Sequence, residues 1–168
     1  MTTFEACAAR VAPLDERAMA AAAARHDQLT KPPGSLGRLE ALGIRLAGIA
    51  GTSPPPRPEP AAVAVFAADH GVVASGVTPW PQDVTAQMVA NFQRGGAAIN
   101  AIAAQVGAVV RVVDVGVATD LSHLGAILHA KVRAGTADLA REPAMTTQDV
   151  TAALDVGASI ATALVDEG

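Results

Sequence analysis

The sequence predicts an α/β fold built on a parallel sheet. Two apolar runs rich in β-forming residues, 61–68 and 108–117, are separated by helical segments, which is the βαβ arrangement with its right-handed crossover. Of the 168 residues, 51% are hydrophobic and 17% are charged, which indicates a folded core and argues against wholesale disorder. With three Phe, one Trp and no Tyr, that core must consist mainly of Ala, Val, Leu and Ile.

The charge and the absence of long apolar runs exclude several kinds of partner. A net charge of −4 argues against a nucleic-acid or anionic-membrane surface, and so few aromatics argue against base stacking. No apolar run approaches the roughly 18 residues that cross a bilayer, and the first residues, MTTFEACAAR, lack the layout of a secretory signal. The single cysteine, Cys7, excludes an internal disulfide framework and is expected to fill space near a loose N-terminus. A cytoplasmic protein is therefore expected.

Two helices are predicted in the N-terminal part. The first spans 13–28, with Pro13 suited to its first turn. Two prolines and two glycines in 29–37 end it, and a second helix follows at about 36–50 with Ser35 as its cap. Large apolar residues recur along this second helix at spacings of three and four, which predicts one apolar stripe: Leu36, Leu39, Leu42, Leu46 and Ile49.

A proline-rich connector, 52–60, predicts a boundary. We expect residues 1–58 to be the N-terminal helical part of a small subdomain, and residues 59–168 to be the N-terminal part of the α/β core domain.

The core domain is predicted to contain two strands and three helices. The run 61–68 is continuous and apolar, which is typical of a strand buried on both faces. Helices are expected from near Pro81 or Gln82, at about 96–106, and at 147–165 after a Thr146 cap with Asp149 near the start. Two strands are too few to cover these helices, so the chain has unrecognised strands, pairs with another chain, or is part of something larger.

Polar residues follow each predicted strand, where ligands bind in open α/β sheets. Asp69 and His70 could perform acid–base chemistry or bind a polar ligand; equally, Asp69 could cap a turn while His70 packs against a loop. Asp114 closes the second strand and is a candidate of the same kind, with a turn carboxylate as the alternative.

The helix after Trp80 carries a polar face beside an apolar one. Gln87, Asn91 and Arg94 share one face, and the adjacent apolar face consists of Val84, Met88 and Phe92. With Trp80 as a wall, this mixture would suit a flat heteroaromatic ligand. The alternative is an ordinary amphipathic helix whose polar face is solvated and whose Met88 and Phe92 belong to the core.

Phosphate-binding candidates are weaker. Gly95 and Gly96 precede a helix and could cradle phosphate, but paired glycines are more often hinges. Lys131, Arg133 and Gly135 could contact a phosphate or form a solvated basic strand. The spacing of the remaining histidines suggests no metal site: His26, His123 and His129.

Four collinear stretches are more specific than these single residues. They are LTKPPGSLGRLEALGIRLAGI (29–49), VAVFAADHGVVASGVTPWPQDVTAQMVANFQRGGAAINAIA (63–103), VVDVGV (112–117) and KVRAGTADLAREPAMTTQDV (131–150). Together they resemble the nicotinate-nucleotide–dimethylbenzimidazole phosphoribosyltransferase family. The resemblance implies a parallel Rossmann-like sheet with flanking helices, a small helical subdomain, a homodimeric full-length protein, and no metal or organic cofactor.

The resemblance also implies a reaction and a set of residues. Phosphoribose would pass from nicotinate mononucleotide to 5,6-dimethylbenzimidazole, giving α-ribazole 5′-phosphate and nicotinate in the assembly of the cobalamin lower ligand. The segment 78–88 matches the part of the family that lines the benzimidazole pocket, next to the family's Asp-His-Gly turn. The implied substrate-binding residues are Thr78, Trp80, Gln87, Met88, Asp69 and His70.

The family's remaining machinery is expected beyond this chain. Its general-base glutamate and its glycine-rich segment for the phosphoribosyl group would lie after Gly168, so no catalytic residue is assigned here and the chain is expected to be an incomplete, inactive portion. The alternatives are a non-catalytic azole-binding module and a general nucleotide-binding α/β module.

Overall fold

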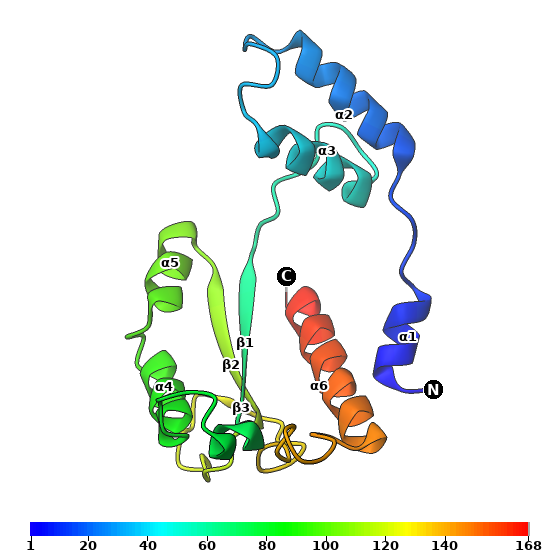
Figure 1. The fold of residues 1–168 in the computed structure, drawn as a ribbon. Helices are drawn as coiled ribbons and strands as arrows, with labels where there is room; N and C mark the ends of the chain where they lie inside the picture. Colours follow the sequence, from blue (N-terminus) through cyan, green and yellow to red (C-terminus); the bar gives the residue numbers. More distant parts are fainter. Residues whose placement is uncertain (168) are drawn as a thin grey trace. The chain divides into compact units, whose positions relative to one another are not determined.

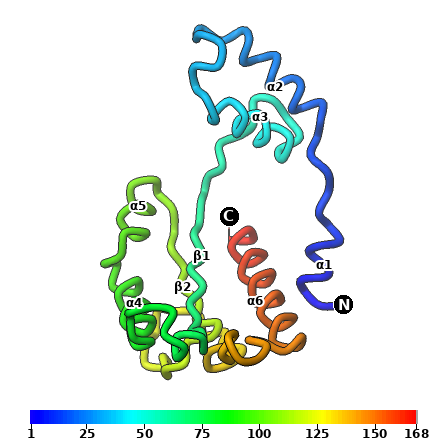
Figure 2. The backbone as a smooth tube through the Cα atoms, in the orientation of Figure 1, coloured from blue at the N-terminus to red at the C-terminus, as the bar shows by residue number. Residues whose placement is uncertain are grey.

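The computed structural model describes residues 1–167 and divides the chain into two compact units. One unit is Arg10–Glu59; the other joins Met1–Ala9 to the chain from Pro60 onward. Figure 2 follows the backbone from the first unit's helices back into the second. Within residues 1–167, no helix combines the length and apolar character needed to cross a membrane.

The helical unit consists of α2 (Glu16–Gln28) and α3 (Arg38–Ala50), which pack against each other. Their buried positions are small residues, Ala18 and Ala22 on α2 and Ala47 and Gly48 on α3. A Cβ on Gly48 would lie 2.6 Å from Met19 Cγ, so glycine at this position lets the two helices approach closely.

The start of α2 differs from the prediction. Pro13 lies outside the helix, because Asp15 is its N-cap: the Asp15 carboxylate accepts the Ala18 N–H at 2.9 Å. The backbone N–H of Asp15 also donates to the Gly48 carbonyl at 3.0 Å, which ties this cap to α3.

One prediction about α3 is wrong. Ser35 does not cap it; the N-cap is Gly37, and Glu40 accepts the free Leu36 N–H at 3.2 Å. The predicted apolar stripe is largely exposed, whereas the buried positions of α3 are small residues. Its five members are 41–66% exposed: Leu36, Leu39, Leu42, Leu46 and Ile49.

The second unit contains the parallel sheet that the sequence predicts. Strands β1 (Ala62–Ala68), β2 (Val109–Gly116) and β3 (Leu128–His129) lie in that order, and both neighbouring pairs are parallel. The βαβ prediction is therefore confirmed. Two residues are too few to show a hydropathy pattern, so β3 was not predicted.

Helices lie on both sides of these strands (Figure 1). A 3₁₀ turn, η1 (Gly71–Ser75), follows β1; α4 (Asp83–Gln93) and α5 (Ala98–Val106) lie on one side, and α6 (Thr147–Asp166) on the other. The buried core joins α4 to the strands and to the loops after β2: Ala67, Val89, Val112, Val117, Leu121 and Ile127.

The expectation that the first strand is buried on both faces is wrong for this chain. Phe66 on β1 is 46% exposed, whereas its partner in the register, Val113 on β2, is fully buried. Within residues 1–167, β1 pairs only with β2 and forms one edge of the sheet. Side chains at an edge strand have neighbours on one side only, which explains the difference.

The two ends of the described chain meet in this unit. Thr146 and Asp149 form the capping box that starts α6, as predicted. The expectation of a loose N-terminus is wrong: α1 (Thr3–Ala9) packs on α6, and the Phe4 N–H donates to the Asp155 carboxylate at 2.8 Å. Cys7 Sγ lies 3.7 Å from Thr162 Oγ1 in the same contact.

Candidate functional site

Two buried carboxylates stand at the carboxyl ends of β1 and β2. Asp69 is 3% exposed and Asp114 is 1% exposed. The Asp69 side chain accepts the Ala118 N–H at 2.8 Å, and the Asp114 side chain accepts the Val117 N–H at 2.9 Å. Both carboxylates thus bind backbone N–H groups of the segment that follows β2. This is the structural alternative given for them in the sequence, in which each is a turn carboxylate.

Lys131 completes this arrangement. Its ammonium group lies 3.3 Å from Asp114 Oδ2 and donates to the carbonyls of Val117 at 2.6 Å and Thr119 at 2.9 Å. These three partners match the three N–H donors of a lysine. Lys131 is therefore engaged with the protein itself, and the hypothesis that it contacts a phosphate is not favoured.

The turn after β1 is locked to the loop that precedes α6. The Thr136 N–H donates to the Asp69 carbonyl at 3.0 Å, and the Gly71 N–H donates to Thr136 Oγ1 at 3.2 Å. A Cβ on Gly71 would lie 2.6 Å from the Thr136 carbonyl oxygen, so this close approach requires glycine. The turn leaves the side chain of His70 exposed.

Asp69 and His70 line a small cavity of about 160 Å³ together with the loop before α6. Sequence reasoning missed two of its other lining residues, Thr136 and Met145, because nothing in the sequence marks them as neighbours of the Asp-His-Gly turn. Arg133 also lines it, but its guanidinium lies 3.1 Å from Asp149 Oδ2.

That ion pair belongs to the start of α6. The pKa of Asp149 is lowered chiefly by the hydrogen bond from the Thr146 backbone, then by the Thr146 hydroxyl, and further by Arg133. Arg133 thus supports the first turn of α6, and its role toward a phosphate is not favoured.

A wider, apolar groove of about 350 Å³ lies between β1 and α4. Met88, which is 38% exposed, lines it with Phe66 and Phe92. Phe92 also packs against the buried core, as the ordinary-helix interpretation expected. The groove offers the apolar surface that a flat ring needs.

Three of the candidate residues line neither of these two spaces. Gln87 is exposed on α4, and Trp80 is 70% exposed in the segment before it. Thr78 Oγ1 accepts the Trp80 N–H at 3.3 Å, a local turn contact. The structure thus places Asp69 and His70 at one cavity and Met88 at a groove, and it does not enclose a ring between Trp80 and Gln87. The ligand-binding roles of these residues stay predictions.

The paired glycines lie in the turn between α4 and α5. The N–H groups of Gly95, Gly96 and Ala97 donate to Phe92 O, Asn91 O and Asn100 Oδ1 at 3.0–3.2 Å. Since these donors are satisfied within the chain, they do not form a phosphate cradle. Within residues 1–167, no three His, Cys, Asp or Glu side chains gather in a way that could hold a metal ion.

Comparisons with known proteins extend this description. A family model described as "Phosphoribosyltransferase" matches residues 11–168. The chain is 53% identical to a nicotinate-nucleotide–dimethylbenzimidazole phosphoribosyltransferase of Salinispora tropica, covering 98% of this chain and 49% of the relative. A relative of the same name from Chloroflexus aurantiacus is 52% identical, over 95% of this chain and 45% of its own length.

A solved structure is similar to the same part of the chain. The crystal structure of the same enzyme from Thermus thermophilus matches 92% of this chain and 47% of its own, with a TM-score of 0.84 and 49% identity. The chain thus spans about half the length of the curated relatives it matches. On the match of the family model and these identities, the chain belongs to the nicotinate-nucleotide–dimethylbenzimidazole phosphoribosyltransferase family.

Proposed function

We propose that this chain supplies the N-terminal half of an enzyme that transfers phosphoribose from nicotinate mononucleotide to 5,6-dimethylbenzimidazole, yielding α-ribazole 5′-phosphate and nicotinate. The observation that carries the proposal is 53% identity across 98% of the chain to a relative named for these two substrates. The reaction would serve assembly of the cobalamin lower ligand. We extend the proposal to a homodimeric full-length protein in the cytoplasm, with small molecules as its partners.

The proposed reaction depends more on positioning the two substrates than on acid catalysis of the departure of nicotinate. A ring nitrogen of the benzimidazole attacks the anomeric carbon, and nicotinate departs as its pyridinium nitrogen becomes neutral, with inversion at that carbon. The attacking ring must lose a proton, and a general base is commonly worth ~10²–10⁴ in rate. Alignment of two bound reactants can supply up to about 7–11 kcal/mol.

The groove between β1 and α4 is the part of the described chain best suited to a flat ring. Met88 would form its apolar wall, and Gln87, one residue earlier on α4, would reach the polar edge of the ring with its amide. Thr78 and Trp80 would border the ring from the segment before α4. This assignment predicts that these side chains close around the azole when it binds.

The structure supports different roles for the two residues of the Asp-His-Gly turn. The buried carboxylate of Asp69 holds the Ala118 N–H, so we propose that it positions the turn rather than reacting. His70 is exposed at the cavity beside it and could contact a substrate. The proton acceptor and the groups that hold the sugar phosphate are proposed to lie on the half of the relatives that this chain does not span.

Calorimetry with 5,6-dimethylbenzimidazole tests the ring site. We expect the Gln87→Ala chain to bind the azole about tenfold more weakly than the unsubstituted chain, which corresponds to about 1.4 kcal/mol. Gln93→Ala is the matched control, since Gln93 is also exposed on α4, and it should leave binding unchanged. If the chain binds the azole and Gln87→Ala binds it equally well, the assignment of Gln87 is wrong.

A turnover assay separates the transferase from a module that only binds azoles. The chain alone should form no α-ribazole phosphate, and a complex that also contains the remaining half should form it. Turnover by the chain alone would place a base within these residues and contradict the proposed division. Azole binding without turnover, even in the complete protein, would favour the binding module.

A further inference from the structure

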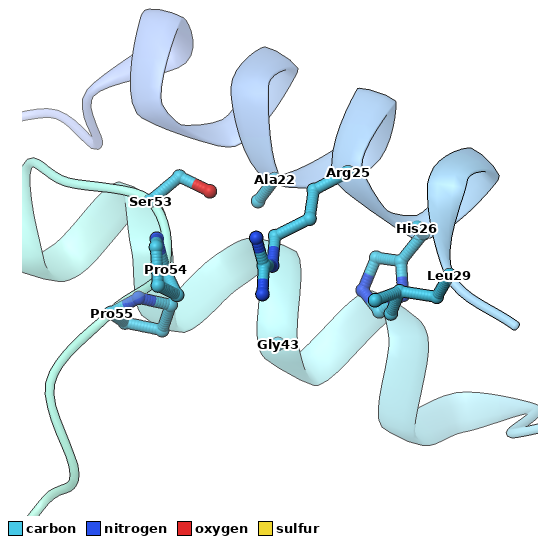
Figure 3. A pocket seen from close by; sticks show the side chains of 8 residues that line it. All are labelled: Ala22, Arg25, His26, Leu29, Gly43, Ser53, Pro54 and Pro55. Atoms are coloured by element: carbon cyan, nitrogen blue, oxygen red, sulfur yellow. The ribbon is translucent and has the colours of Figure 1, made fainter.

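A separate cavity of about 160 Å³ lies inside the helical unit, between α2, α3 and the proline-rich segment (Figure 3). Ala22, Leu29, Gly43 and Pro54 contribute apolar lining. This cavity is partly open, and a volume of about 150 Å³ has room for a benzene-sized molecule. By size and lining, this space therefore suits a single six-membered ring.

One ring atom of His26, a residue that lines this cavity, has no hydrogen-bond partner. His26 Nδ1 is buried and makes no hydrogen bond to any residue described in the structure. The imidazole lies against α3, with Nε2 3.6 Å from the position that a Cβ on Gly43 would take. A buried polar atom without a partner carries a free-energy cost. Because the protein itself encloses Nδ1, a molecule in the cavity would contact the accessible part of the His26 ring and not this atom.

A positive charge stands at this cavity. In Figure 3 the side chain of Arg25 extends from α2 into the space between Pro54 and His26. Among residues 1–167, no carboxylate forms an ion pair with Arg25. Glu40, whose pKa is lowered chiefly by Lys31 and slightly by His26, is already bound to Lys31 at 2.8 Å.

We propose that this cavity binds a small, flat aromatic carboxylate with one ring. The ring would occupy the apolar space beside the His26 ring, and the carboxylate would pair with the Arg25 guanidinium. Arg pairs well with carboxylates because its planar guanidinium can donate two parallel hydrogen bonds. A phosphate or a nucleotide fits less well, since the walls are apolar and the volume holds one ring.

Nicotinate is one member of this ligand class. If it binds here, the helical unit carries a second site for the leaving group of the transfer reaction. Only this consequence rests on the proposed function; the binding site itself does not.

The experiment is an NMR titration of the chain with benzoate and with benzamide, its neutral match in size. Benzoate should cause saturable shifts in α2 and α3 and should move the ring resonances of His26, which lines the cavity. Benzamide should bind at least about tenfold more weakly, because it cannot form the charge-assisted pair with Arg25. Nicotinate and nicotinamide, as a second pair, should reproduce this difference.

Arg25→Gln should weaken benzoate binding at least about tenfold. Arg17→Gln is the matched control: Arg17 is an exposed arginine of the same helix that does not line the cavity, and its loss should change nothing. Equal binding of benzoate and benzamide, or benzoate binding that survives Arg25→Gln, would overturn the proposal. So would the absence of any shift at His26.

Filling the cavity gives an independent check. Gly43→Leu should abolish benzoate binding, whereas Gly43→Ala should retain the fold and the site, because the added Cβ would meet His26 only at an ordinary 3.6 Å contact. If Gly43→Leu does not fold, the comparison of Arg25→Gln with Arg17→Gln alone decides whether benzoate binds in this cavity. Binding of nicotinate here in a chain that binds no azole would keep this site and contradict the proposed function.

Discussion

The two long strands of the sheet have similar apolar sequences and different surroundings. β2 has a strand on each side, and Val112, Val113 and Asp114 on it are at most 5% exposed. β1 has a neighbour on one side within the described chain, and its Phe66 is 46% exposed. Apolar composition alone therefore does not determine burial; the number of neighbouring elements does.

The candidate functional residues divide in the same way. Near the carboxyl end of β2, the polar groups satisfy one another: Asp114 and Lys131 fix the loop that follows. Along β1, the apolar groove with Met88 is open and Gln87 is exposed. The polar groups near the end of β2 thus stabilise the fold, and the candidate ring site is the groove between β1 and α4.

The largest expected effect tests the ion pair between Lys131 and Asp114. Lys131→Met should lower the free energy of unfolding by about 3 kcal/mol, because it leaves the Asp114 carboxylate buried without its counter-ion. Arg111→Met is the control, on the same strand as Asp114: both partners of the Arg111–Glu167 pair are exposed, so its loss should cost less than about 1 kcal/mol. Urea denaturation measures both. Equal losses would show that burial of Asp114 contributes little.

The next effect tests the strands themselves. Val113→Ala should cost about 2 kcal/mol of unfolding free energy, since Val113 is fully buried and its methyl groups leave a gap. Phe66→Ala removes a larger side chain but should cost less than about 1 kcal/mol in this chain, because Phe66 is half exposed. Urea denaturation measures both free energies of unfolding. If Phe66→Ala costs more than Val113→Ala, β1 is not the less buried strand and the comparison of β1 with β2 is wrong.

The smallest effect concerns the start of α6. Thr146→Ala should cost about 1 kcal/mol, because the Asp149 N–H loses its acceptor in the capping box. Thr151→Ala, a control in an exposed position of the same helix, should not destabilise it. Thermal unfolding followed by circular dichroism measures both variants.

The same cap predicts a pH dependence. The pKa of Asp149 is lowered in the folded chain, chiefly by the hydrogen bond from the Thr146 backbone, so its stabilising contribution is present at neutral pH. It should be lost as the pH falls below the ordinary value of 3.8 and through the lowered pKa. Asp149→Asn should reduce the loss of stability with acid; an unchanged pH profile would contradict this role.

Sequence patterns predicted the elements whose signals are local. The strand at 108–117, the helix at about 96–106 and the Thr146 cap all depend on neighbouring residues, and the structure confirms them. The prediction that Ser35 caps α3 was wrong. Glu40, inside the helix, accepts the Leu36 N–H, and Ser35 makes no cap contact.

Properties that depend on distant partners were not predictable. Burial of β1 and of the leucines on α3 depends on which elements cover them, and the pairing of Lys131 with Asp114 depends on the loop between them. The candidate site could be predicted as a segment, 69–88. Its assembly could not, because the residues around Asp69 come from the loop before α6, at Thr136 and Met145.

The packing of α1 on α6 has a consequence for the order of events during synthesis. Phe4 and Asp155 bond across 151 residues of sequence, and the helical unit 10–59 is inserted between α1 and the rest of its unit. On the ribosome, α2 and α3 can contact each other as soon as both have emerged, whereas α1 cannot pack on α6 until the chain through Asp166 has been translated. The contact between α1 and α6 therefore forms only after every element between them has been made.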